Sequence, residues 1–245
     1  MKPYDQVSEG LYLIRGKRSN IYLLTGEQPV LIDAGMPGDE AVILTALKDS
    51  GACPEQLQYI FITHAHLDHV GSLAAVKNAT GARIVAGERE KDFLEGKKKL
   101  YTMRREGVGG KLFAVLLFFM ERFMIPYQPV SVDIACTGAN GGETIGEMKV
   151  IAAPGHSRGS LAYYHPGKRL LFTGDALSGS PCLRLPPRGG CCDYTTALES
   201  AAALSALDFD ACLFGHGAPL SRSAHEQVRA LVTKSKQDGK LTSKD

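Results

Sequence analysis

The densest group of potential metal ligands in this sequence is the segment Thr63–His69, which reads T-H-A-H-L-D-H. His64 and His66 alternate just past an expected strand, so their rings can point toward one ion. Asp68 and His69 follow where the chain is expected to enter a helix, and they can hold a second ion nearby. Histidine and carboxylate ligands suit zinc, and also iron or manganese. Because burying four such polar groups without a metal carries a large desolvation cost, the segment predicts a metal site.

Three more potential ligands each come directly after an expected strand: His156 in P-G-H-S-R-G-S, Asp175 in G-D-A-L and His216 in G-H-G. Glycines beside them let the backbone approach an ion. Because loops at one end of a rigid sheet can converge, we expect all these groups to meet. His165 and His225 lack this setting, so we expect them to be structural or exposed.

The elements that must position these residues alternate between strands and helices, which indicates a layered α/β protein. Strands are expected at residues 10–15, 20–25, 30–33, 59–63, 83–86, 147–153, 160–165, 169–173 and 211–214. Helices are expected at residues 39–50, 69–80, 88–95, 195–207 and 223–234. The first three strands form an expected meander. Asp33 ends the third of them, either as a turn residue or as an acceptor that orients a ligand histidine; we favour the second role.

Composition is ordinary for a globular protein, with 245 residues of which 44% are hydrophobic. We expect one domain over residues 1–234 and a polar tail at 235–245. A formal charge of +2, with dispersed lysines and arginines, does not indicate nucleic acid as a partner. The N-terminus shows no secretory signal, so the expected location is the cytoplasm. The six cysteines show no C-x-x-C spacing and are expected to be free thiols.

Residues 96–129 form an expected insertion with a different pattern. A basic stretch, K-K-K-L-Y-T-M-R-R, is followed by an apolar run at 112–120, which is far shorter than the roughly 20 residues that span a bilayer. The run predicts a helix that is apolar on two sides. This helix is either part of the core or a cap. As a cap, it would offer the apolar side chains of Phe113, Phe119 and Met120 to an apolar or acyl substrate, a lipid, or a second subunit in a homodimer through residues 97–126.

With these motifs in place, the chain resembles the metallo-β-lactamase superfamily from about residue 7 to residue 232. The motifs that carry the resemblance are L-I-D-A-G at Asp33, H-A-H-L-D-H at 64–69, and the three motifs around His156, Asp175 and His216. The resemblance implies an α/β fold, the αβ/βα four-layer sandwich of two mixed β-sheets with helices outside.

The resemblance also implies two divalent metal ions per chain, most simply zinc. One ion would be held by His64, His66 and His156. The other would be held by Asp68, His69 and His216, and Asp175 would bridge the two.

Departures from the family pattern limit the substrate assignment. Cysteine-ligand β-lactamases carry cysteine where this chain has Asp175, and glyoxalase II has a long C-terminal glutathione-binding region that is not expected here. Acyl-homoserine lactonases place a tyrosine three residues after the bridging aspartate, where this chain has Ser178. Arg158 stands where proline is commoner, either as a contact for an anionic substrate or as a surface residue.

The predicted activity is hydrolysis of a small-molecule carboxylic ester, thioester or lactone by a hydroxide shared between the two ions, since bound zinc lowers the pKa of water to about 7. Asp68 is the expected catalytic residue, which orients the hydroxide or shuttles a proton. Two alternatives remain open. One is phosphodiester hydrolysis at the same centre, with phosphate bound by Lys97–Lys99 and Arg104–Arg105. The other is oxidation of a thiol or persulfide at a single iron.

Overall fold

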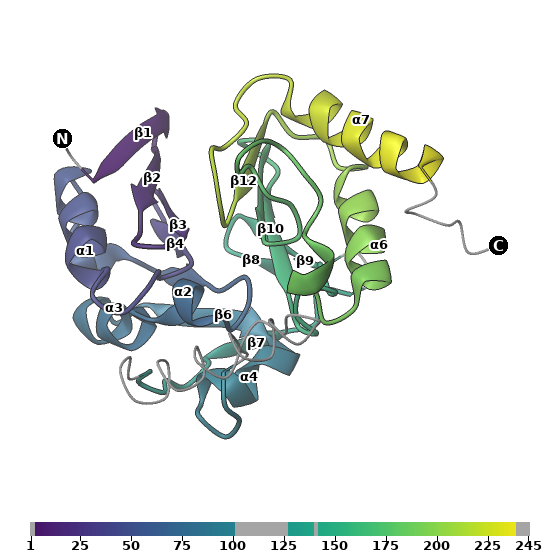
Figure 1. Cartoon of the computed structure of the whole chain (residues 1–245). Coiled ribbons are helices and arrows are strands. Elements are labelled where there is room, and N and C mark those ends of the chain that lie inside the picture. Colours follow the sequence, from purple (N-terminus) through teal and green to yellow (C-terminus); the bar gives the residue numbers. More distant parts are fainter. Residues whose placement is uncertain (1–2, 101–126, 140–141, 239–245) are drawn as a thin grey trace. The chain divides into compact units, whose positions relative to one another are not determined.

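The computed structural model describes residues 3–100, 127–139 and 142–238. Most of the expected insertion, residues 101–126 with Phe113, Phe119 and Met120, lies outside these ranges, so the cap and homodimer hypotheses stay predictions. The chain folds into two compact units, Met1–Cys136 and Thr137–Asp245, each built on its own sheet (Figure 1). The single domain expected over residues 1–234 stays a prediction.

The first unit is built on a seven-stranded mixed sheet in the order β1-β2-β3-β4-β5-β6-β7. Its strands are β1 (Tyr4–Ser8), β2 (Leu11–Arg15), β3 (Asn20–Leu24), β4 (Val30–Ile32), β5 (Tyr59–Phe61), β6 (Arg83–Gly87) and β7 (Ile134–Cys136). The pairs from β1 to β4 are antiparallel, which confirms the expected meander, and those from β4 to β7 are parallel.

The parallel register brings the first group of predicted ligands to one edge of this sheet. Ile32 of β4 pairs with Phe61 of β5, and Phe61 pairs with Val85 of β6. The hydrogen bonding between β4 and β5 continues for one step past β4, with Asp33 N–H donating to the Phe61 carbonyl at 2.9 Å. The chain therefore leaves β4 at Asp33 and β5 just before Thr63 on the same side.

The helices of the first unit are α1 (Glu40–Asp49), η1 (Pro54–Gln56), α2 (Leu67–Val70), α3 (Leu73–Thr80) and α4 (Glu88–Leu94). The single helix expected at 69–80 is wrong, because the chain breaks between α2 and α3 at Gly71 and Ser72. A Cβ on Gly71 would lie 2.2 Å from the Pro37 side chain. The Ser72 hydroxyl accepts hydrogen bonds from the backbone N–H groups of Asp39 at 3.0 Å and Glu40 at 3.1 Å, so the break anchors the start of α1.

The second unit is built on a five-stranded mixed sheet in the order β12-β11-β10-β9-β8. Its elements are β8 (Thr144–Ile145), β9 (Met148–Ala152), β10 (Leu161–His165), β11 (Leu170–Gly174), η2 (Arg188–Gly190), α6 (Tyr194–Leu204), β12 (Ala211–Phe214) and α7 (Ala224–Gln237). Only β11 and β12 are parallel. Helices α6 and α7 contact each other, and α7 contacts β12 (Figure 1). No helix in the described ranges is long and apolar enough to cross a bilayer.

Three strands were not predicted, and each depends on pairing more than on its own pattern. β1 is an edge strand with one buried residue, Tyr4, while β7 and β8 have three and two residues. Helix α7 runs three residues past its predicted end at Lys234, since Ser235 is buried at 5% exposure. Most of the polar tail expected at 235–245 lies outside the described residues, so that expectation stays a prediction.

Candidate metal centre

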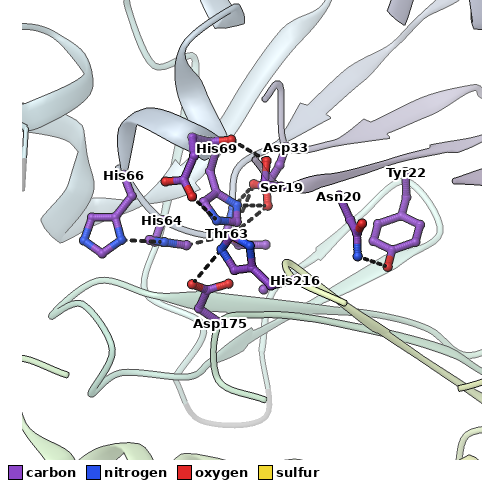
Figure 2. A network of polar contacts seen from close by, with 12 residues as sticks. Ser19, Asn20, Tyr22, Asp33, Thr63, His64, His66, His69, Asp175 and His216 are labelled. Atoms are coloured by element: carbon purple, nitrogen blue, oxygen red, sulfur yellow. Dashed lines mark hydrogen bonds and ion pairs between the residues drawn. The ribbon is translucent and has the colours of Figure 1, made fainter. Parts of the chain in front are cut away.

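Asp33 organises the ligand cluster of the first unit. It follows β4 with φ at 61°, a left-handed conformation that aspartate tolerates better than most residues. Its carboxylate, in a residue only 2% exposed, accepts hydrogen bonds from the Thr63 N–H at 2.8 Å and the Thr63 hydroxyl at 2.8 Å. The Nδ1 atom of His69 lies 2.8 Å from the same carboxylate (Figure 2). Asp33 is therefore the acceptor that orients a predicted ligand histidine, rather than only a turn residue.

These hydrogen bonds fix which ring nitrogen carries the proton in two histidines. A carboxylate only accepts, so Nδ1 of His69 donates to Asp33, and the Thr63 hydroxyl gives its single proton to Asp33 as well. The Thr63 oxygen then accepts from Nδ1 of His64, 3.0 Å away. In their neutral forms both imidazoles present an unprotonated Nε2, the form in which histidine binds a metal.

The remaining ring nitrogen of His64 faces a ring nitrogen of His66. Nε2 of His64 lies 2.9 Å from Nδ1 of His66, and the ring centroids are 4.5 Å apart (Figure 2). His64 is fully buried, whereas His66 is half-buried. Since Nε2 of His64 carries no proton, the pair is satisfied either by a proton on His66 or by a shared cation. The donors present therefore fit a divalent metal.

Asp68 and His69 lie on the short helix α2. The Nε2 atom of His69 is 3.9 Å from a carboxylate oxygen of Asp68, whose side chain is 27% exposed. The backbone of both residues is held from outside the helix: the Ser19 hydroxyl donates to the Asp68 carbonyl, and Ala34 N–H donates to the His69 carbonyl at 2.7 Å. These contacts place a carboxylate and an unprotonated imidazole nitrogen beside each other, and both are donor types that a divalent metal binds.

In the second unit, Asp175 lies between two histidines. Gly174 of β11 pairs with Phe214 of the parallel strand β12, so Asp175 and His216 leave the sheet at the same edge. One carboxylate oxygen of Asp175 is 3.3 Å from Nε2 of His216 and 3.4 Å from Nε2 of His156 (Figure 2 shows the contact with His216). One carboxylate oxygen therefore lies close to two imidazole nitrogens, and all three atoms are of types that bind a divalent metal.

The loop that carries His156 packs tightly against α6. Gly155 has a φ of 125°, and a Cβ on it would lie 2.2 Å from the Ala197 nitrogen, so only glycine fits there. The Gly155 N–H donates to the Ser157 carbonyl at 2.9 Å, and Cys192 N–H donates to the His156 carbonyl at 3.2 Å. The position of His156 is thereby fixed by backbone contacts on both sides.

The two remaining histidines have local structural partners. His165, only 3% exposed, accepts a hydrogen bond at Nδ1 from Lys168 N–H at 3.1 Å. The ring of His225 packs edge-on against Phe209, with the centroids 5.4 Å apart. These contacts agree with the structural or exposed roles expected for both.

The predicted substrate contacts differ in their surroundings. Arg158 is exposed. Ser178 is buried, and its hydroxyl accepts from Ser180 N–H at 3.2 Å, which gives it a role within its own loop. In the basic stretch, Lys97 lies 2.6 Å from Glu95 and Lys98 lies 2.8 Å from Asp92. Two lysines of the phosphate-binding alternative are therefore already paired.

Three residues that support this cluster were not predicted from the sequence: Ser19, Thr63 and Glu90, whose carboxyl group accepts a hydrogen bond from Ala65 N–H at 2.9 Å. Thr63 stands beside the histidines, but only its contacts with both Asp33 and His64 reveal its role. Ser19 lies in a turn far along the chain from the cluster. Glu90 belongs to a charged run, E-R-E-K-D, in which no periodic signal separates a buried carboxyl from its exposed neighbours.

Comparisons with known proteins agree with these observations. A family model described as the metallo-beta-lactamase superfamily matches residues 14–216. A Bacillus subtilis (strain 168) protein named "Probable metallo-hydrolase YflN" is 28% identical over 233 residues, which cover 88% of this chain and 87% of that protein. A hydroxyacylglutathione hydrolase of Ectopseudomonas mendocina (strain ymp) is 32% identical over 153 residues, which cover 61% of this chain and 43% of that enzyme.

Among solved structures, BJP-1, a subclass B3 metallo-β-lactamase of Bradyrhizobium japonicum, matches with a TM-score of 0.67 at 24% identity, covering 97% of this chain and 92% of that chain. This likeness confirms the predicted α/β fold class of two mixed sheets with helices, the αβ/βα fold. With the family model matched over most of its length, the chain belongs to the metallo-β-lactamase superfamily.

Proposed function

We propose that this protein is a dinuclear metal hydrolase that cleaves a carboxylic ester, thioester or lactone. The observation that carries the proposal is the position of Asp175, whose single carboxylate oxygen lies 3.4 Å from His156 and 3.3 Å from His216. With two cations bound, a carboxylate in this position would share its charge between them, and a two-metal hydrolytic site needs such a ligand.

The ligand set proposed for the two ions draws on both units. His64, His66 and His156 would hold one ion, while Asp68, His69 and His216 would hold the other, with Asp175 shared. All seven side chains offer imidazole nitrogens or carboxylate oxygens, which are donors of the kind that zinc binds. Zinc is the proposed metal, and iron or manganese are the alternatives that metal analysis would reveal.

The protein side chains would then have distinct roles in the reaction. Bound divalent cations supply Lewis acidity that polarises a carbonyl and makes water nucleophilic near neutral pH. Asp68, whose side chain is 27% exposed, can accept a hydrogen bond from a reacting water and carry a proton away from it. Asp33 holds His69, and Thr63 holds His64, in the tautomer that leaves Nε2 available.

Thioesters are the substrate class that the relatives favour. Hydroxyacylglutathione hydrolases, by their name, act on an acyl group attached to glutathione, which is a thioester. The match covers 43% of one such enzyme, so recognition of glutathione itself is not part of the proposal. A small acyl thioester is therefore the first substrate to test, with lactones and simple esters next.

The test combines metal quantification of freshly purified protein with a substrate panel of thioesters, lactones and phosphodiesters. We expect two zinc ions per chain and turnover of at least one carbonyl substrate that a chelator abolishes and zinc restores. Preferential cleavage of phosphodiesters would replace the proposal with the phosphodiesterase alternative. One iron per chain, with oxygen consumed by a thiol or persulfide, would replace it with the dioxygenase alternative.

A further inference from the structure

Glu90 is a buried carboxyl group on α4 that faces the ligand segment. Its side chain belongs to a residue with 0% exposure, although Glu88 and Arg89 in the same turn are exposed. One of its carboxyl oxygens accepts a hydrogen bond from the backbone N–H of Ala65 at 2.9 Å. Burying a carboxyl group costs free energy unless its oxygens are hydrogen-bonded. The bond from Ala65 N–H offsets part of that cost.

Ala65 is the residue between His64 and His66. The chain has already left β5, which ends at Phe61, so the amide of Ala65 lies beyond the end of that strand. A buried N–H must nevertheless find an acceptor, and the Glu90 side chain supplies one from a different element. The peptide that joins His64 to Ala65 is thus held by α4 rather than by a strand of the sheet.

Two separate supports then serve the two pairs of ligands in this unit. Asp33 holds the His69 ring directly through a hydrogen bond of 2.8 Å. Glu90 instead holds the backbone from which His64 and His66 extend, and Nε2 of His64 lies 2.9 Å from Nδ1 of His66. A small rotation of the Ala65 peptide would change that separation, because both histidines are joined directly to Ala65.

On these grounds, we propose that Glu90 is a positioning residue for the metal ion held by His64 and His66, acting through the Ala65 amide. The inference rests on the proposed function for the presence of that ion. Hydrogen-bonded partners of ligand side chains typically contribute about 10–100-fold to metal affinity, and we expect the same range for a partner of the backbone that joins two ligands. The effect should fall on one of the two ions, since the backbone of Asp68 and His69 is held by Ser19 and Ala34.

The test uses the full-length protein, stripped of metal and titrated with zinc against a chromophoric chelator. Glu90→Met fills a similar space without an acceptor, whereas Glu90→Gln keeps an acceptor oxygen. Glu88→Met and Glu88→Gln are matched controls on the exposed side of the same helix. Amide hydrogen exchange of Ala65 in the metal-free protein reports on the hydrogen bond itself, independently of activity.

We expect Glu90→Met to weaken one zinc site about 10–100-fold, to leave the other within about threefold, and to speed exchange at Ala65. Glu90→Gln should retain both the protected amide and the zinc affinity, and neither Glu88 variant should change them. Wild-type affinity at both sites in folded Glu90→Met would overturn the proposal, as would a Glu90→Gln variant that loses as much affinity as Glu90→Met.

Should Glu90→Met fail to fold, Glu90→Gln decides the question. A protected Ala65 amide with unchanged zinc affinity supports the proposal, and a weakened zinc site in the folded Gln variant contradicts it. Failure of the broader function is distinguishable. A wild type that binds two zinc ions but cleaves no substrate sinks the hydrolase proposal alone, while a wild type that binds no metal overturns both.

Discussion

Replacing Asp33 by asparagine changes the protonation pattern of the ligand cluster while it preserves shape. Asparagine tolerates the φ of 61° found at this position, and its carbonyl oxygen can still accept from Thr63 N–H. Its amide group, however, donates where the carboxylate accepted. Facing such a donor, Nδ1 of His69 must become an acceptor, and the proton moves to Nε2. The nitrogen proposed to bind the metal is then blocked.

The expected size of this effect follows from the hydrogen bond between Asp33 and His69 that the substitution removes. Hydrogen bonds to a charged acceptor each contribute about 1.5–3 kcal/mol, so the free energy of unfolding of the metal-free protein should fall by about that amount. Disturbing an outer partner of a ligand histidine typically lowers metal affinity by about 10–100-fold. We therefore expect Asp33→Asn to weaken the ion bound by His69 by about that factor.

The assay is a zinc titration of metal-free protein by chelator competition, together with urea unfolding and ¹⁵N NMR of the histidine rings, which identifies the tautomer. Asp39→Asn is the matched control, because Asp39 is also buried, at 3% exposure, and accepts from Met36 N–H at 2.8 Å and Lys17 N–H at 3.1 Å. It should lose stability without losing zinc affinity. Unchanged zinc affinity and an unchanged His69 tautomer in folded Asp33→Asn would refute the reasoning.

Three further predictions concern other parts of the chain. Asp175→Asn should lower metal content and hydrolysis together, and retention of both ions with full activity would disprove its bridging role. Burial opposes ionisation of Asp133, but hydrogen bonds from Lys77 and a backbone N–H outweigh it, so its pKa lies below the ordinary value of 3.8. The stability that ionised Asp133 contributes is therefore fully present above pH 3.8 and is lost as pH falls through its lower pKa in the folded protein. In metal-free protein, the difference in urea midpoint between wild type and Asp133→Asn should shrink as pH falls below 3.8. A difference that stays constant with pH would contradict this. Burial raises the pKa of the Cys212 thiol, so a thiol reagent at pH 8 should label exposed Cys53 and spare Cys212 until the protein unfolds, and equal labelling in the native state would show the burial to be wrong.

The sequence was sufficient for those features that depend on residue type and position along a strand. His64, His66, Asp175 and His216 follow apolar strands, and their types alone indicate metal binding. The parallel register of β11 with β12 then brings the last two together, as expected for loops at one end of a sheet.

Features that depend on contacts between distant residues were not predictable in the same way. The break between α2 and α3 arises because Gly71 lies against Pro37, a contact that no helical periodicity reveals. Glu90 bonds the amide of Ala65, and Thr63 bonds the ring of His64. Neither hydrogen bond can be inferred from the type of residue at these positions. The edge strand β8 has two residues and exists only through its pairing with β9.

The central proposal is that the seven ligand residues hold two metal ions with Asp175 shared between them. Anomalous diffraction from zinc-loaded crystals of the full chain tests this proposal most directly. We expect two anomalous peaks: one about 2.0–2.2 Å from ring nitrogens of His64, His66 and His156, and one at a similar distance from Asp68, His69 and His216. A carboxylate oxygen of Asp175 should lie within bonding distance of both peaks. A single peak, or two peaks with Asp175 bound to neither, would contradict the account.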